Sequence, residues 1–299
     1  MRIFDEVLAR VEAEIAAHPP ERGGLLFGPV GRDVITLFEP DEDARTSAVT
    51  YTISARMCAE APRIERATGL EYKGVIHSHP RSMDHPSGGD RASAANALRL
   101  NPHMGRFFMP IVTTRAANGK SEASHEILLG SGVISGYVAT RGEHAGADAA
   151  VSPTALFEVP LRKYLVAACA RLVGRGPFGE AMIEGAPKAI VHDGIHQLAY
   201  VLRCDTLRFI VMASEFFPHA APQVVRADDV GTRALPVVWS MDRDPGDCLA
   251  QSIAEMRHAS RHEEFSKPWW KAQNKLWKRR EKKQRKRGKN ANKKKGGRK

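Results

Sequence analysis

Two histidines separated by one residue, and followed at fixed spacing by a serine and an aspartate, constrain this chain more than any other feature. They are His77, His79, Ser87 and Asp90. Alternate residues of a β-strand point to the same side, so both imidazoles face one way if they end a strand. Two imidazoles and one carboxylate form a zinc set with a vacant fourth position, as in catalytic zinc sites. The sequence therefore predicts Zn²⁺ as cofactor, with His77, His79 and Asp90 as its ligands.

The flanking residues indicate where this site lies in the fold. Gly74-Val75-Ile76 is a short apolar run that predicts a buried strand, and residues 90–100 predict a helix. Ser87-Gly-Gly-Asp90 is also the pattern of a helix capping box, which by itself is a structural feature. Asp90 can serve as a cap and as a ligand at once. The metal would lie where the strand ends and the helix begins.

These residues together resemble the JAMM (JAB/MPN/Mov34) metalloproteases, with a prokaryotic-type JAB domain. The upstream glutamate of that family's pattern is present in its usual setting, Glu21-Arg-Gly-Gly-Leu-Leu-Phe-Gly. The resemblance covers roughly residues 1 to 135, and its two halves match independently. It implies a mixed sheet flanked by helices, a zinc cofactor and the hydrolysis of amide bonds.

The chemistry of amide hydrolysis suits the same residues. Zinc lowers the pKa of water toward neutrality. Glu21 would take the proton and pass it to the leaving amine, and the hydroxyl of Ser87 would stabilise the oxyanion together with zinc. The JAMM resemblance implies the same two catalytic residues. Taken alone, Glu21 could be a solvated charge, and Asp84 and His85 could be further ligands, substrate contacts or exposed loop residues.

Helices and strands alternate along the chain, which predicts an α/β (α+β) sandwich. Helices are expected at residues 1–18, 55–68, 90–100 and 161–173. Strands are expected at residues 25–27, 33–38, 49–53, 73–79, 107–114, 125–129, 188–191, 197–203 and 207–213. The first helix carries early acidic residues and does not have the pattern of a signal peptide.

A length of 299 residues suggests about two domains. We expect the JAB/MPN domain at 1–138, a small, polar linker at 139–154, a second, smaller α+β domain at 155–262 and a basic, Trp-containing, disordered tail at 263–299. The sequence has no apolar run long enough to span a membrane, which predicts no membrane partner. Its four cysteines are widely spaced and suggest no disulfide framework, so a reducing cytoplasm is the expected compartment.

The second part resembles the ubiquitin-conjugating (E2) fold. A predicted helix and three strands are followed by an aromatic-Pro turn at Phe217-Pro218, and Cys248 lies about where such a fold keeps its thioester cysteine. The family's His-Pro-Asn is missing before Cys248, and its double proline is reduced to Ala221-Pro222. The alternative for Cys248 is a small buried residue on a helix.

The net charge of +11 is concentrated at one end of the chain. Residues 267–299 contain 17 of the 45 basic residues and one of the 34 acidic ones, so they carry +16 and the remainder carries −5. Such a block is an interaction arm that can bind nucleic acid nonspecifically, or it is a solubilising or docking extension. The candidate nucleic-acid contacts are Trp269, Trp270, Lys278, Arg279 and Arg280.

Two classes of function follow. The first is a zinc isopeptidase or peptidase that cleaves at the C-terminus of a ubiquitin-like modifier, with that modifier or its conjugate, and E1/E2-like pathway proteins, as partners. The second is a non-catalytic scaffold or nucleic-acid-associated protein that uses the basic tail. Within the first class, a combined protease and E2-like conjugation protein that uses Cys248 is a further alternative. Inactive members of the superfamily usually lack the zinc ligands, and this chain keeps them, which favours the enzyme.

Overall fold

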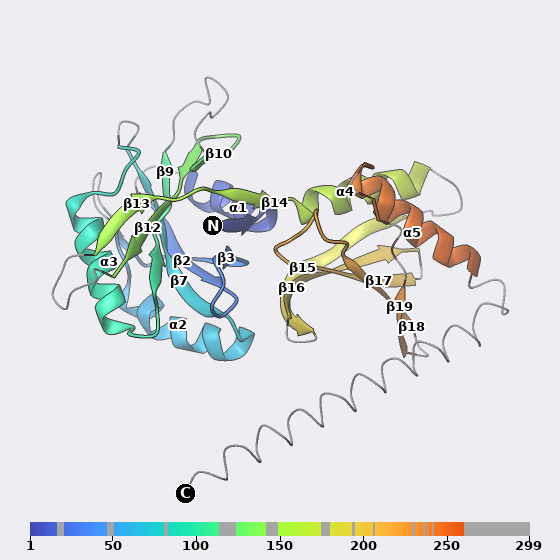
Figure 1. Ribbon diagram of the computed structural model, residues 1–299, viewed down its shortest axis with the longest axis horizontal. Helices are drawn as coiled ribbons and strands as arrows, with labels where there is room; N and C mark the ends of the chain where they lie inside the picture. Colours follow the sequence, from blue (N-terminus) through green and yellow to red (C-terminus); the bar gives the residue numbers. More distant parts are fainter. Residues whose placement is uncertain are drawn as a thin grey trace, which may run out of the picture. The chain divides into compact units, whose positions relative to one another are not determined.

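The computed structural model describes most of the chain up to residue 259. The described residues are 1–16, 21–46, 51–80, 83–113, 124–141, 149–174, 180–192, 195–205, 207–228, 231–235, 237, 239–240 and 242–259. Contacts group residues 1–250 into one compact unit and residues 251–299 into another. Sheets flanked by helices fill the first unit (Figure 1), so the predicted α/β class is confirmed.

The first half of the chain, up to α4, holds most of the short strands. The helices are α1 (Asp5–Val11), which continues as a π-helical segment (Glu12–Ala16), α2 (Ala55–Thr68), α3 (Gly88–Leu100) and α4 (Leu161–Gly174). The strands are β1 (Arg2–Phe4), β2 (Gly23–Gly28), β3 (Val34–Ile35), β4 (Leu37–Pro40), β5 (Arg45–Thr46), β6 (Tyr51–Thr52), β7 (Glu71–His79), β8 (Arg106–Phe108), β9 (Ile111–Thr113), β10 (Glu126–Leu128), β11 (Val133–Ser135), β12 (Tyr137–Thr140), β13 (Ala150–Pro153) and β14 (Phe157–Val159).

Strand β7 lies inside a nine-stranded sheet and carries both histidines at its end. It pairs antiparallel with β2 and parallel with β8 and β9. From Lys73 to His79 every residue of β7 is buried, as expected for a strand with neighbours on both edges. The histidines therefore lie on a buried strand that has paired neighbours on both sides.

Helices α2 and α3 cover one face of this sheet. Leu25 and Phe27 of β2 and Val75 of β7 form one apolar cluster with Met57 of α2 and Leu98 of α3. Helix α2 has the predicted bounds because residues next to each of its ends mark where the helix begins and stops. The hydroxyl of Ser54 accepts from the backbone N–H of Met57, and Gly69 ends the helix in the left-handed conformation.

The N-terminal prediction is wrong in part. Residues 2–4 form a strand, β1, where a continuous helix was expected, and α1 begins only at Asp5. β1 lies between β3 and β14, with parallel pairing to both. A strand held by partners about 30 and 155 residues away has no local signal, because strand propensity depends on the neighbours it packs against.

The predicted linker at 139–154 is also wrong over its described residues. Strands β12 and β13 pair antiparallel from Tyr137↔Pro153 to Thr140↔Ala150 and extend the nine-stranded sheet. β14, which the prediction placed in the second domain, pairs with β1. Small, polar residues indicated a linker here, but they also suit a hairpin at a sheet edge.

The later part of the first unit begins with α4 and continues as an antiparallel meander. Its strands are β15 (Ala181–His192), β16 (Ile195–Cys204), β17 (Leu207–Ala213), β18 (Gln223–Asp228) and β19 (Gly231–Leu235), in that spatial order. The turn after β17 holds the buried Phe217, whose ring packs on Trp239. Helix α5 (Pro245–Ala259) follows. The order of helix, three strands and aromatic-Pro turn is thus observed.

The basic tail predicted at 263–299 lies outside the described residues. No helix within the described ranges is long and apolar enough to cross a membrane.

Substitution of Gly74 tests the close packing between β7 and β8. Its φ is +154°, and a Cβ at this position would lie 1.8 Å from the carbonyl oxygen of Phe108 in β8. Gly74→Ala should therefore lower the free energy of unfolding by at least ~2 kcal/mol, measured by denaturant titration with circular dichroism. Gly105→Ala, where no atom of the described residues other than Gly105 and its two chain neighbours lies within 4 Å of the new Cβ, should change it by less than ~0.5 kcal/mol. Equal effects of the two substitutions would contradict this packing.

Candidate metal centre

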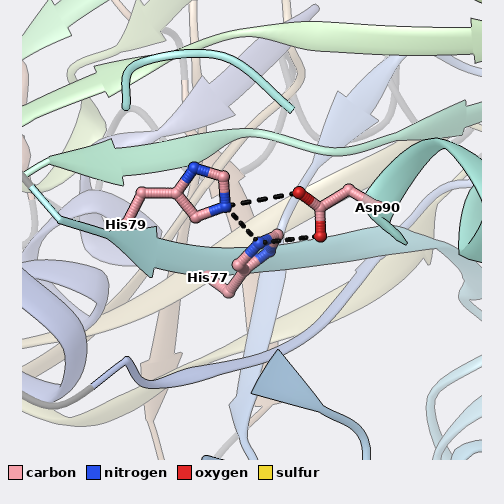
Figure 2. A group of neighbouring side chains, drawn as sticks. All are labelled: His77, His79 and Asp90. Carbon is pink, nitrogen blue, oxygen red and sulfur yellow. Dashed lines mark hydrogen bonds and ion pairs between the residues drawn. The ribbon is translucent and has the colours of Figure 1, made fainter. Parts of the chain in front are cut away.

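His77, His79 and Asp90 converge at the junction of β7 and α3. The Nε2 atoms of the two histidines lie 2.9 Å apart. Nε2 of His77 lies 3.2 Å from Oδ1 of Asp90, and Nε2 of His79 lies 3.3 Å from Oδ2. Figure 2 shows the three side chains pointing toward one another. The predicted ligand set is therefore brought together in space, and no further His, Cys, Asp or Glu joins this group among the described residues.

The spacing of these donor atoms fits a metal ion. Ligand atoms about 2.0–2.1 Å from a tetrahedral zinc lie roughly 3.3 Å from each other, and the three separations here are 2.9, 3.2 and 3.3 Å. Two neutral imidazole nitrogens cannot hydrogen-bond unless one of them carries the proton. A cation between all three atoms satisfies them together, so the residues present fit Zn²⁺.

The two histidines are held in different ways. Nδ1 of His79 lies 3.1 Å from the backbone oxygen of Met83, which fixes this ring with Nε2 toward Asp90. Nδ1 of His77 is buried and has no hydrogen-bond partner among the described residues. The ring of Tyr51 instead lies nearly parallel to the imidazole of His77, with centroids 5.5 Å apart and planes inclined by 13°.

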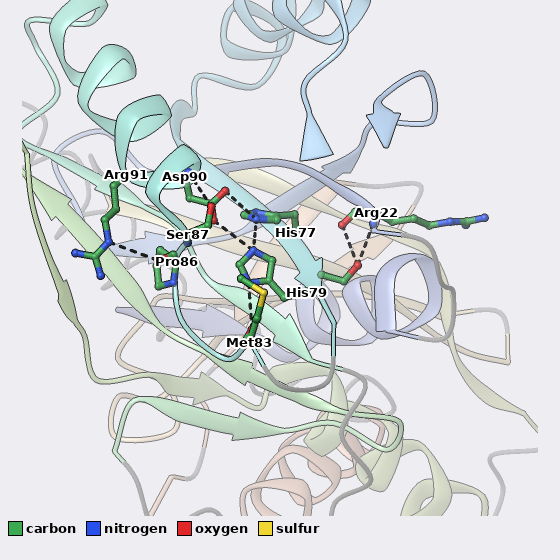
Figure 3. Close-up of polar contacts among 9 residues, drawn as sticks. Arg22, His77, His79, Met83, Pro86, Ser87, Asp90 and Arg91 are labelled. Atoms are coloured by element: carbon green, nitrogen blue, oxygen red, sulfur yellow. Dashed lines mark hydrogen bonds and ion pairs between the residues drawn. The ribbon is translucent and has the colours of Figure 1, made fainter. Parts of the chain in front are cut away.

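Asp90 has two roles in the same place. Its carboxylate accepts from the backbone N–H of Ser87 at 2.7 Å, and its own N–H donates to the hydroxyl oxygen of Ser87 at 3.2 Å. This reciprocal pair is the capping box that starts α3. Figure 3 shows the carboxylate between Ser87 and the histidines. The cap is thus observed, and it fixes the carboxylate of Asp90 where it could also serve as a metal ligand.

Glu21 lies beside the three ligands. Antiparallel pairing of β2 with β7 sets Gly23 opposite His77, and the backbone N–H of Ser78 donates to the carbonyl oxygen of Arg22 at 2.8 Å. Glu21 is the next residue toward the histidine end of β7. It is 6% exposed, and its charge interacts with His79, His77 and Asp90.

Burial and charge act against each other on these groups. Burial raises the pKa of Glu21, and the nearby histidines offset only part of that rise. Burial would raise the pKa of Asp90, but hydrogen bonds from His77 and His79 hold it below its ordinary value. Burial would lower the pKa of His79, and Asp90 reverses this, so that pKa is raised. These surroundings therefore favour a positive charge next to an ionised Asp90.

The remaining sequence candidates lie elsewhere. Asp84 and His85 are exposed and pair with each other, as expected of loop residues. Cys248 lies in α5 with no exposed surface, which contradicts a thioester cysteine, because transfer requires an accessible sulfur. Its alternative as a small buried helix residue fits. Trp269, Trp270, Lys278, Arg279 and Arg280 fall outside the described residues.

Sequence reasoning missed two residues around the site. Ser78, between the histidines, accepts from the backbone N–H of Arg22 at 2.9 Å through its hydroxyl and so ties the Glu21 segment to β7. Tyr51 approaches His77 from a hairpin distant in sequence. A small hydroxyl residue between two ligands was a weak signal for the first, and nothing local pointed to the second.

Metal analysis tests this centre. Protein purified and then loaded with Zn²⁺ should retain about one ion per chain after dialysis. His77→Ala should lose the ion, because it removes one of three converging donors. His85→Ala removes a histidine from the neighbouring loop that does not face the site and should retain it. Retention by His77→Ala, or equal loss from both variants, would contradict the ligand set.

Comparison with known proteins places the first part of the chain in a family. A sequence model described as prokaryotic homologs of the JAB domain matches residues 2–125. Among curated proteins the chain has no match.

Solved structures give weaker likenesses. A protein from Desulfitobacterium hafniense, solved in solution, is 18% identical with a TM-score of 0.38, covering 54% of this chain and 94% of that one. A JAB1/MPN domain protein from Archaeoglobus fulgidus is 22% identical with a TM-score of 0.23, covering 38% of this chain and 78% of that one. The family match therefore identifies residues 2–125 of this chain as a JAB domain of the prokaryotic type.

Proposed function

We propose that this protein is a zinc-dependent isopeptidase or peptidase that hydrolyses an amide bond at the C-terminus of a ubiquitin-like modifier. The observation that carries the proposal is the convergence of His77, His79 and Asp90 with a buried Glu21 beside them. JAB domains that lack activity usually lack the ligands, and this chain keeps all three. The modifier as substrate rests on the family resemblance, whereas the site itself supports only amide hydrolysis.

Zinc would be held by Nε2 of His77, Nε2 of His79 and the carboxylate of Asp90. When bound, it supplies a Lewis acid that makes water nucleophilic near neutral pH. The chain's own residues then direct the proton. Glu21 takes a proton from the attacking water while the oxygen of that water bonds to the carbonyl carbon. Glu21 then gives the proton to the amine nitrogen as the C–N bond breaks.

The environment of Glu21 suits this exchange. A general base works best when its pKa is close to the operating pH, and burial raises the pKa of this carboxyl above its ordinary value. A zinc ion held by the three ligands would limit that rise through its positive charge, so the carboxylate form would stay available. Glu21 is thus a carboxyl that can accept a proton and then release it.

Ser87 can stabilise the oxyanion of the tetrahedral intermediate. Its hydroxyl oxygen already accepts from the backbone N–H of Asp90, so its orientation is fixed by the helix cap. The hydroxyl proton, which in this structure interacts with the carboxylate of Asp90, would turn to the oxyanion as its charge develops.

The +16 charge of residues 267–299 favours a second candidate, a scaffold or nucleic-acid-associated protein that uses this segment. An E2-like second domain also remains a proposal. It is supported by the order of α4, β15, β16, β17 and the Phe217-Pro218 turn. The burial of Cys248 speaks against conjugation by this chain.

Substitution of Glu21 tests the enzyme against the scaffold. Glu21→Gln should keep zinc, because Glu21 is not among the three ligands, and should lower turnover of a ubiquitin-like fusion at least ~100-fold, since general base catalysis is lost. Cleavage is followed on gels with and without a chelator. Glu60→Gln, which removes a partly exposed carboxylate of α2 that pairs with Arg63, should cleave like the wild type.

The two possible failures have different meanings. Unchanged turnover in Glu21→Gln would remove Glu21 from the mechanism. Absence of chelator-sensitive cleavage from the zinc-loaded wild type, across a panel of such fusions, would favour the scaffold.

A further inference from the structure

We propose that Tyr51 is a positioning residue of the metal centre, which holds the imidazole of His77 so that its Nε2 faces His79 and Asp90. The inference rests on the proposed metal site and extends it beyond the ligands and Glu21. It arises from the different surroundings of the two histidines.

Metal-binding histidines are normally oriented by a hydrogen bond from the second ring nitrogen. His79 has this partner, the backbone oxygen of Met83 at 3.1 Å. For His77, no hydrogen-bond partner of Nδ1 exists in the part of the chain that the structure describes. The two ligands therefore need different means of orientation, although both are buried at the end of the same strand.

Tyr51 supplies the missing constraint. Its ring lies nearly parallel to the imidazole at a centroid distance of 5.5 Å, within the range of offset-stacked pairs. A flat ring against one face of the imidazole opposes rotation about the Cβ–Cγ bond. That rotation is the one that would turn Nε2 away from the other ligands.

The backbone is shaped to admit this ring. Gly23 lies opposite His77 in the β2–β7 pair. A Cβ on Gly23 would lie 2.8 Å from Cζ of Tyr51, 2.8 Å from Cβ of His77 and 2.6 Å from the carbonyl oxygen of Ile76. The space that a side chain at position 23 would fill is thus the space through which Tyr51 reaches His77.

The hairpin that carries Tyr51 is fastened next to the same glycine. The backbone N–H of Asp41 donates to the carbonyl oxygen of Gly23 at 2.9 Å. The buried carboxylate of Asp41 then accepts from both the backbone N–H and the hydroxyl of Ser54, each at 2.7 Å. The two ends of the segment from Asp41 to Ser54 are therefore bonded to each other beside Gly23. Tyr51 lies in this segment, on β6.

These contacts predict that the plane of the ring matters and its hydroxyl does not. Tyr51→Phe keeps the plane and should bind Zn²⁺ within about threefold of the wild type. Tyr51→Leu removes the plane and should weaken zinc affinity by roughly 10- to 100-fold, the usual effect of losing an orienting group around a metal ligand. Affinity is measured by competition with a chromophoric chelator.

A spectroscopic measurement separates positioning from general loss of packing. The visible absorption of the Co²⁺-loaded protein reports the symmetry of the ligands. It should change in Tyr51→Leu and be restored in Tyr51→Phe. Tyr72→Leu is the matched control, because Tyr72 packs on Phe27 and Phe107 in the core; it should lower stability and leave zinc affinity and the Co²⁺ spectrum unchanged. If Tyr51→Leu does not fold, Tyr51→Met, which is also non-planar, takes its place.

The outcomes distinguish this inference from the proposed function. Wild-type zinc affinity and spectrum in Tyr51→Leu or Tyr51→Met would overturn the role of Tyr51 alone, as would equal losses in Tyr51→Phe. Zinc binding by the wild type without any cleavage would overturn the proposed function and leave Tyr51 as a positioning residue. A wild type that binds no zinc would overturn both.

Discussion

Backbone pairing between β2 and β7 is the constraint on which the site depends. It places Gly23 opposite His77 and fastens Arg22 to Ser78. Glu21 and the two histidines, more than fifty residues apart in sequence, thereby lie at the same end of this strand pair. Because residues of a strand alternate between faces, a slip of one residue would turn the histidines away from α3. The register of these two strands thus decides whether a metal site exists.

The first turn of α3 supplies the third donor, the carboxylate of Asp90, in a fixed orientation. A capping box needs Ser87 and Asp90 in one relative orientation, and that orientation aims the carboxylate at both imidazoles. The same contacts therefore begin a helix and complete a ligand set. Because the same two residues can do both, the sequence of Ser87 and Asp90 alone is compatible with a helix cap and with a metal ligand.

Sequence predicted best what local contacts determine. The bounds of α2 follow from Ser54 and Gly69 at its ends, and the ligand set follows from strand alternation and a cap. The β1 strand, the β12–β13 hairpin and the stacking of Tyr51 on His77 all depend on partners distant in the chain. The residues next to them in the sequence do not indicate those partners, so these three features could not be predicted from sequence patterns alone. The burial of Cys248 was likewise settled only by the packing of α5.

X-ray absorption at the zinc edge, on protein loaded with one equivalent of Zn²⁺, tests the central claim most directly. The convergence of His77, His79 and Asp90 predicts scattering from two imidazole rings and first-shell nitrogen and oxygen atoms at about 2.0–2.1 Å. A sulfur shell at about 2.3 Å, or an oxygen shell without imidazole scattering, would contradict it.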